Sequence, residues 1–147
     1  MDGKAARQKD PLLDHPTIPA ARPARARANG LSEGWAAVLG LGWPIVFWLM
    51  GFLEPRPANP QAALTPIEVV VVGAFLVGLL ATSVLAGTRQ RAAAPAAVIT
   101  GLVTVAMVVS CPVSGHHHFG AWWLAELALV LAMLAVSVAG LRETARQ

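Results

Sequence analysis

The chain contains little charge and only one cysteine. Of its 147 residues, 13% are Asp, Glu, Lys or Arg, whereas a soluble domain carries about 25%. This charge is too sparse to cover a water-facing surface. The lone thiol of Cys111 excludes an intrachain disulfide and any CxxC redox or zinc motif. No catalytic triad, phosphate loop, dinucleotide fingerprint or HExxH helix is present, which argues against an enzyme of those classes.

Long apolar runs account for most of the remaining sequence, and 56% of the residues are hydrophobic. A helix that crosses a membrane needs about 20 apolar residues, and in lipid each run must be helical because extended backbone would leave its polar groups unpaired. The sequence therefore predicts an all-α, integral membrane, four-helix transmembrane bundle. Its four predicted spans are residues 35–53, 66–87, 95–111 and 119–141.

The segment before the first span is basic and rich in proline. Residues 1–34 contain six of the eleven Lys and Arg residues, and four prolines lie between positions 10 and 30. Such a segment is too poor in apolar residues to offset the entropy of ordering, so we expect a disordered basic cytoplasmic tail. Its basic residues are not interleaved with aromatic ones, which argues against nucleic-acid binding.

The distribution of basic residues predicts the orientation of the four spans. If the N-terminus is cytoplasmic, ten of the eleven Lys and Arg residues lie on the inner side, in residues 1–34, 88–94 and 142–147. One, Arg56, lies outside. By the positive-inside rule we expect a multi-pass protein of the cell membrane with both termini cytoplasmic and residues 142–147 as a short C-terminal tail. The predicted partners are the lipid bilayer and either other proteins or further copies of this chain.

A cysteine and three histidines lie between the third and fourth spans. Cys111, His116, His117 and His118 are candidate ligands of zinc or copper, because both metals bind thiolate and imidazole. Ser114 is the predicted N-cap of the last helix, which would place the histidines in its first turn. Adjacent helical side chains point about 100° apart, so the three imidazoles cannot all bind one ion. The alternative is a polar outer turn without metal.

Two acidic residues fall inside the predicted spans. Glu126 lies within the last run and is expected to face the bundle interior, because a carboxyl group inside a membrane costs a few kcal/mol. There it either donates a hydrogen bond across helices, handles protons or cations, or contacts a substrate. Glu68 lies three residues into the second run, at headgroup depth. His118, Trp122 and Glu126 share one helix face by spacing, which predicts a polar cavity open to the outside.

Proline marks two positions in these runs. Pro44 lies in the middle of the first span, where it removes a backbone donor and frees a carbonyl oxygen that needs either a neighbouring helix or a local adjustment to be satisfied. Pro95 opens the third span, a position that proline favours.

Two functions follow from these features. The sequence favours a small polytopic membrane protein that acts as a structural or accessory subunit of a larger membrane complex, rather than an enzyme. The alternative is metal- or proton-linked transport or sensing through an outward-facing polar cavity. The residues expected to line that cavity are Cys111, His116–His118, Glu68 and Glu126.

Overall fold

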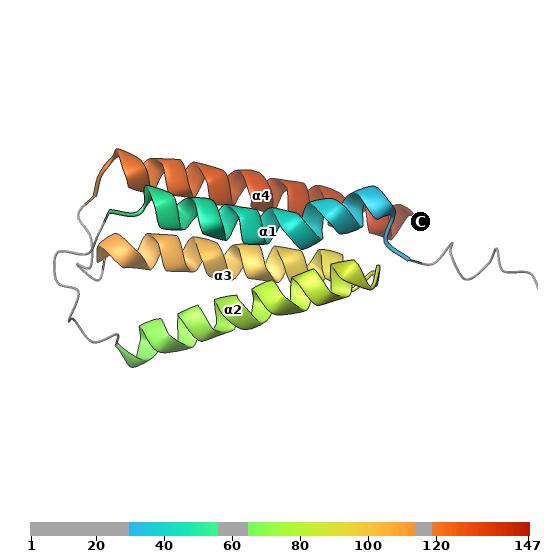
Figure 1. Ribbon diagram of the computed structural model, residues 1–147, viewed down its shortest axis with the longest axis horizontal. Coiled ribbons are helices and arrows are strands. Elements are labelled where there is room, and N and C mark those ends of the chain that lie inside the picture. The colour runs from blue at the N-terminus through green and yellow to red at the C-terminus, as the bar shows by residue number, and fades with distance from the viewer. Residues whose placement is uncertain (1–29, 56–64, 114–118) are drawn as a thin grey trace, which may run out of the picture.

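Each of the four apolar runs forms one long helix. The computed structural model describes residues 30–55, 65–113 and 119–147. Each helix runs antiparallel to the one before it in the chain (Figure 1). All four helices are long and apolar enough to span a membrane, so the predicted all-α bundle is confirmed. The helices are α1 (Glu33–Leu53), α2 (Pro66–Gly87), α3 (Ala93–Val113) and α4 (Ala121–Arg146).

The helices differ from the predicted spans mainly at their ends. The predicted tail, residues 1–34, is too long, because Leu31 is buried and Ser32 caps α1 by accepting a hydrogen bond from the backbone N–H of Trp35. At the other terminus, residues 142–146 continue α4 instead of forming a separate tail. Hydropathy detects the apolar part of a helix, whereas charged residues can prolong the same helix beyond the lipid. The remainder of the predicted tail lies outside the described residues.

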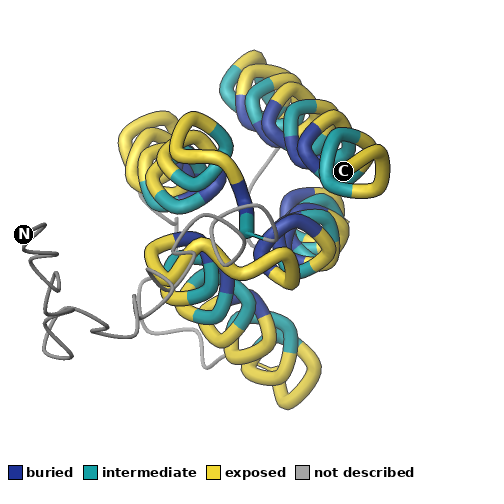
Figure 2. Tube along the Cα trace, turned by 90° about the vertical axis from the view of Figure 1, so that its right-hand side faces the viewer, coloured by how far each residue is buried: buried dark blue, intermediate teal, exposed yellow. Residues whose placement is uncertain are grey.

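The helices form a ring in which neighbours along the chain pack together. α4 also packs against α1, which closes the ring, and α1 contacts α3 across it. Figure 2 shows the buried positions facing the centre and the exposed ones facing outward. In α1 and α4 the buried residues recur every three or four positions, as in helices that contribute one face to a bundle. In α4 they are Glu126, Val130, Met133, Ser137 and Gly140.

Buried hydroxyl groups in the core are all hydrogen-bonded. The indole N–H of Trp43 donates to Ser137 Oγ (3.1 Å), which links α1 to α4, and Ser137 in turn donates to the carbonyl of Met133 (2.9 Å). The hydroxyls of Thr82 and Thr100 bond each other (3.1 Å) and link α2 to α3. Further along α3, Thr104 donates to the carbonyl of Thr100 (2.7 Å). The polar core is thus satisfied at these positions.

The carbonyl that Pro44 leaves without a helical donor is satisfied by the next helix, as predicted. Proline has no N–H, so the oxygen four residues earlier, on Gly40, loses its usual partner. Ser83 of α2 donates its hydroxyl to that oxygen (3.2 Å). The same arrangement occurs at Pro112 of α3, where the freed oxygen of Val108 accepts from the indole N–H of Trp123 on α4 (2.9 Å).

A double-mutant cycle tests the first of these pairs. Ser83→Ala should lower the free energy of unfolding by about 1 kcal/mol, the scale of hydrogen bonds between transmembrane helices. In a Pro44→Ala background the same change should have almost no effect, because the alanine introduced there supplies a backbone N–H to the carbonyl of Gly40. Unfolding by a denaturing detergent in mixed micelles, followed by circular dichroism, measures both values. Equal losses in the two backgrounds would show that Ser83 acts independently of the proline.

Candidate functional site

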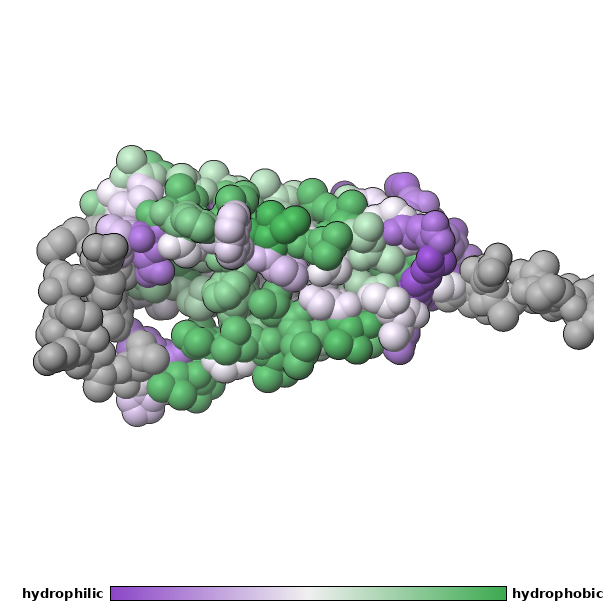
Figure 3. Space-filling view, in the orientation of Figure 1, coloured by the Kyte–Doolittle hydropathy of each residue, from purple (hydrophilic) through white to green (hydrophobic). Residues whose placement is uncertain are grey.

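The charged residues of the described chain gather at the two ends of the bundle, as Figure 3 shows. One end, here the acidic end, lies where α1 and α3 finish and α2 and α4 start. It carries Glu54, Glu68 and Glu126 and, among residues 30–55, 65–113 and 119–147, no lysine or arginine. The opposite end, here the basic end, carries Glu33, Arg89, Arg91, Arg142, Glu143 and Arg146.

Glu126 is buried inside the acidic end. It lies about 8 Å from the start of α4 at about 1.5 Å per residue, and it is the first member of the buried stripe of that helix. Its residue surface is 4% exposed, and within the described part of the chain its Oε1 atom has no hydrogen-bond partner. The expectation that Glu126 faces the bundle interior is confirmed. A hydrogen bond from this oxygen across the helices is not found there.

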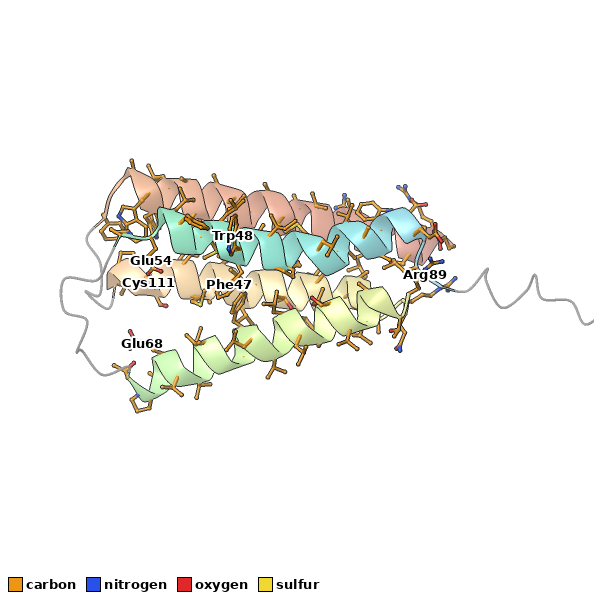
Figure 4. The ribbon with its side chains drawn as sticks, viewed as in Figure 1. Phe47, Trp48, Glu54, Glu68, Arg89 and Cys111 are labelled. Atoms are coloured by element: carbon orange, nitrogen blue, oxygen red, sulfur yellow. The ribbon has the colours of Figure 1, made fainter. Side chains whose placement is uncertain are left out.

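The other two acids and the thiol lie around this position. Glu54 caps the C-terminal end of α1, and Cys111 is half-buried near the end of α3. Figure 4 shows Glu54, Cys111 and Glu68 together at the acidic end. The acidic end therefore carries side chains from all four helices.

Glu68 has a structural task at the start of α2. Its Oε2 accepts hydrogen bonds from the backbone N–H (2.7 Å) and the hydroxyl (2.9 Å) of Thr65. In return, the Thr65 oxygen accepts from the backbone N–H of Glu68 (3.3 Å), which completes a capping box. These bonds favour the interpretation of Glu68 as a headgroup-depth acid over that of a cavity acid.

The predicted start of the last helix was wrong. The N-cap of α4 is Gly120 rather than Ser114, so the first turn begins at Ala121 and does not contain the histidines. Glycine is an acceptable N-cap, and histidine is a weaker helix former than the alanine and leucine that follow. The helical spacing that joined His118 to Glu126 therefore does not apply. His116, His117 and His118 themselves lie outside the described residues.

Within residues 30–55, 65–113 and 119–147, no three Cys, His, Asp or Glu side chains come together in a way that could hold a metal ion. Cys111, Glu68 and Glu126 thus do not form a metal centre among themselves. Zinc or copper binding by Cys111 with the histidines stays a prediction.

Two tryptophans that join neighbouring helices were missed by the sequence reasoning. Trp123 is half-buried and holds the acidic ends of α3 and α4 together by its hydrogen bond to the carbonyl of Val108. Trp43 is fully buried in the core. The sequence feature that could have indicated the role of Trp123 is Pro112. A proline inside a helix frees a carbonyl oxygen, and a donor on a neighbouring helix can then satisfy that oxygen. A tryptophan in the middle of a span, as at position 43, indicates a core contact.

The arrangement at the acidic end suits proton exchange better than covalent chemistry. A carboxyl group that is buried and lacks a partner must either carry a proton or pair with a cation, because an isolated carboxylate is costly to bury. Comparison of the chain with protein-family models, with curated proteins and with solved structures finds no match. The functional argument therefore depends on the geometry of this site.

Proposed function

We propose that this chain is an accessory subunit of a membrane complex that responds to protons through Glu126. The observation that carries the proposal is the contrast between this carboxyl and the other buried polar groups. Thr82, Thr100, Thr104 and Ser137 are buried and hydrogen-bonded, whereas Oε1 of Glu126 has no partner in the described part of the chain. An unbonded acid lowers stability, and intramembrane acids commonly serve a function.

Sensing fits the bundle better than transport. The core side chains of Leu39, Trp43 and Val130 are fully buried, and the indole of Trp43 is bonded to Ser137. They lie further from the acidic end than Glu126, so Glu126 is in reach of one membrane face. A proton taken up there changes the charge of the acidic end, and a partner protein in contact with that end could detect the change.

A proton is favoured over a metal ion by the composition of the site. Glu126 has no second and third ligand among the described residues, whereas proton binding requires only one carboxyl group. Metal-linked sensing through Cys111 and His116–His118, which follow α3 in the sequence, is the alternative that the test below separates.

Infrared spectroscopy of the full-length protein in lipid nanodiscs tests the proposal. Near neutral pH, where solvent-exposed carboxyl groups are ionised, the wild type should show the carbonyl band of a protonated carboxyl group, and this band should shift with deuteration and decrease as the pH is raised further. Glu126→Gln should abolish the band, because an amide cannot titrate. Glu143→Gln, at the basic end, should leave it unchanged.

Four outcomes would contradict the proposal. Near neutral pH, the band could persist in Glu126→Gln, or it could be absent from the wild type. The third is stoichiometric zinc or copper that is retained through purification and lost when His116–His118 become alanine, which would support the metal alternative. Proton flux in liposomes that Glu126→Gln abolishes would overturn the sensing role in favour of transport.

A further inference from the structure

A groove lies on the outside of the bundle near the basic end, away from the site described above. It has a volume of about 670 Å³ and runs along α4 beside the first turn of α1. The residues that line it are Trp35, Leu131, Leu134, Ala135, Val138, Ala139, Arg142, Glu143 and Arg146.

The wall contributed by α1 is a single tryptophan held close to α4. A side-chain carbon built on Gly140 would lie 3.0 Å from Cε3 of Trp35 and 3.5 Å from Cδ1 of Leu39. The absence of a side chain at position 140 therefore allows the Trp35 ring to pack directly against α4. This contact shapes one side of the groove.

The chemistry of the groove changes along its length as a lipid leaflet does. From Leu131 to Ala139 its lining is entirely apolar, and from Arg142 onward it is charged. Leu131 and Arg142 are separated by about 16 Å at about 1.5 Å per residue, close to half of a hydrocarbon core of about 30 Å. The apolar part thus matches one acyl layer, and the arginines lie at headgroup depth.

The charge at the rim is positive. Arg89, at the same end, is paired with Glu33, and Arg146 lies 4.0 Å from Glu143. No ion pair of Arg142 occurs within the described residues, and its side chain is exposed. One guanidinium group is therefore available for an anion beside a partly neutralised second one.

We propose that this groove binds one anionic phospholipid, with an acyl chain along Leu131–Ala139 and the phosphate at Arg142 and Arg146. Basic pockets beside transmembrane helices are suited to acidic headgroups. A partner helix fits less well, because it would cross both leaflets, whereas the groove ends near mid-membrane. Such a helix would also bury the charge of Arg142 without supplying an anion.

Native mass spectrometry of the full-length protein, stripped of lipid in mild detergent and titrated with defined lipids, tests this proposal. Phosphatidylglycerol should bind at least about fivefold more tightly than phosphatidylcholine of the same chains. Arg142→Gln should weaken phosphatidylglycerol binding about fivefold, the effect expected for one basic residue near a headgroup. Arg91→Gln, an exposed arginine at the same end but outside the groove, should leave the affinity unchanged.

A second variant tests the apolar wall. Ala135→Trp places a bulky ring on an exposed position and should weaken the binding of both lipids, because the ring obstructs the acyl chain. Circular dichroism should show the same helix content as in the wild type. Equal affinity of the wild-type protein for the two lipids would overturn the proposal. Equal losses of phosphatidylglycerol affinity in Arg142→Gln and Arg91→Gln would also overturn it. The proposal would also be overturned if the wild type formed an oligomer that Ala135→Trp dissociates while lipid binding is unchanged. The groove would then bind a second copy of the chain.

Discussion

Gly101→Leu is expected to lower the free energy of unfolding by about 3 kcal/mol, the upper part of the range for overpacked cores. A side-chain carbon at position 101 would lie 2.7 Å from Cδ1 of Leu134 and 2.8 Å from Cζ2 of Trp43. The Trp43 ring cannot move away easily, because it is buried and bonded to Ser137. Lipid is as apolar as leucine, so the larger side chain gains nothing from burial that would offset the clash.

The matched control for this variant is Gly73→Leu in α2. A carbon built at position 73 meets no atom within 4 Å, and the residue is exposed, so the stability should change by less than about 0.5 kcal/mol. Detergent-induced unfolding in mixed micelles compares the two variants under identical conditions. Similar losses at both positions would show that α3 does not contact α1 and α4 closely at Gly101.

Glu126→Leu is expected to raise the free energy of unfolding by about 1–3 kcal/mol, which is unusual for a change at a buried position. The substitution removes a buried oxygen that lacks a partner in the described chain and replaces it with an apolar group of comparable size. The increase in stability measures how much the proposed proton site destabilises the wild-type fold, since functional sites are commonly less stable than their apolar replacements. The same unfolding assay measures it.

Glu68→Leu is the informative control. It replaces an acid at the same end of the bundle, but its expected change in the free energy of unfolding has the opposite sign. Loss of the capping box with Thr65 should lower the stability by about 1 kcal/mol. If Glu126→Leu also lowered the stability, the carboxyl would be bonded in the folded protein. That result would support a structural hydrogen bond and contradict the proton-responsive role.

The fold could be predicted from the sequence because the solvent constrains it. Apolar runs of sufficient length have one conformation available in lipid, so the number of helices and their approximate extent followed from hydropathy. Helix ends were less predictable, since they depend on local caps. The Thr65-x-x-Glu68 pattern is a capping box that can be read from the sequence, and it fixes the start of α2.

The candidate site was only partly predictable for a different reason. The cost of a buried acid requires that Glu126 faces other helices, and this held. Its surroundings depend on which residues of α1 and α3 lie at the same depth, and composition does not encode that relation. The presence of Glu54, the C-cap of α1, at the acidic end could therefore not be predicted, and the helical spacing from His118 failed because α4 starts later than expected.

The two proline–donor pairs have a consequence for how sequence changes can accumulate in chains related to this one. Each pair joins adjacent helices at a single depth, Pro44 with Ser83 between α1 and α2 and Pro112 with Trp123 between α3 and α4. Apolar packing alone tolerates sliding of one helix along another, whereas one donor meeting one freed carbonyl fixes the vertical register. When a related chain loses one of these prolines, the carbonyl regains its helical donor and the side-chain donor is no longer needed. Each proline and its donor should therefore be gained and lost together.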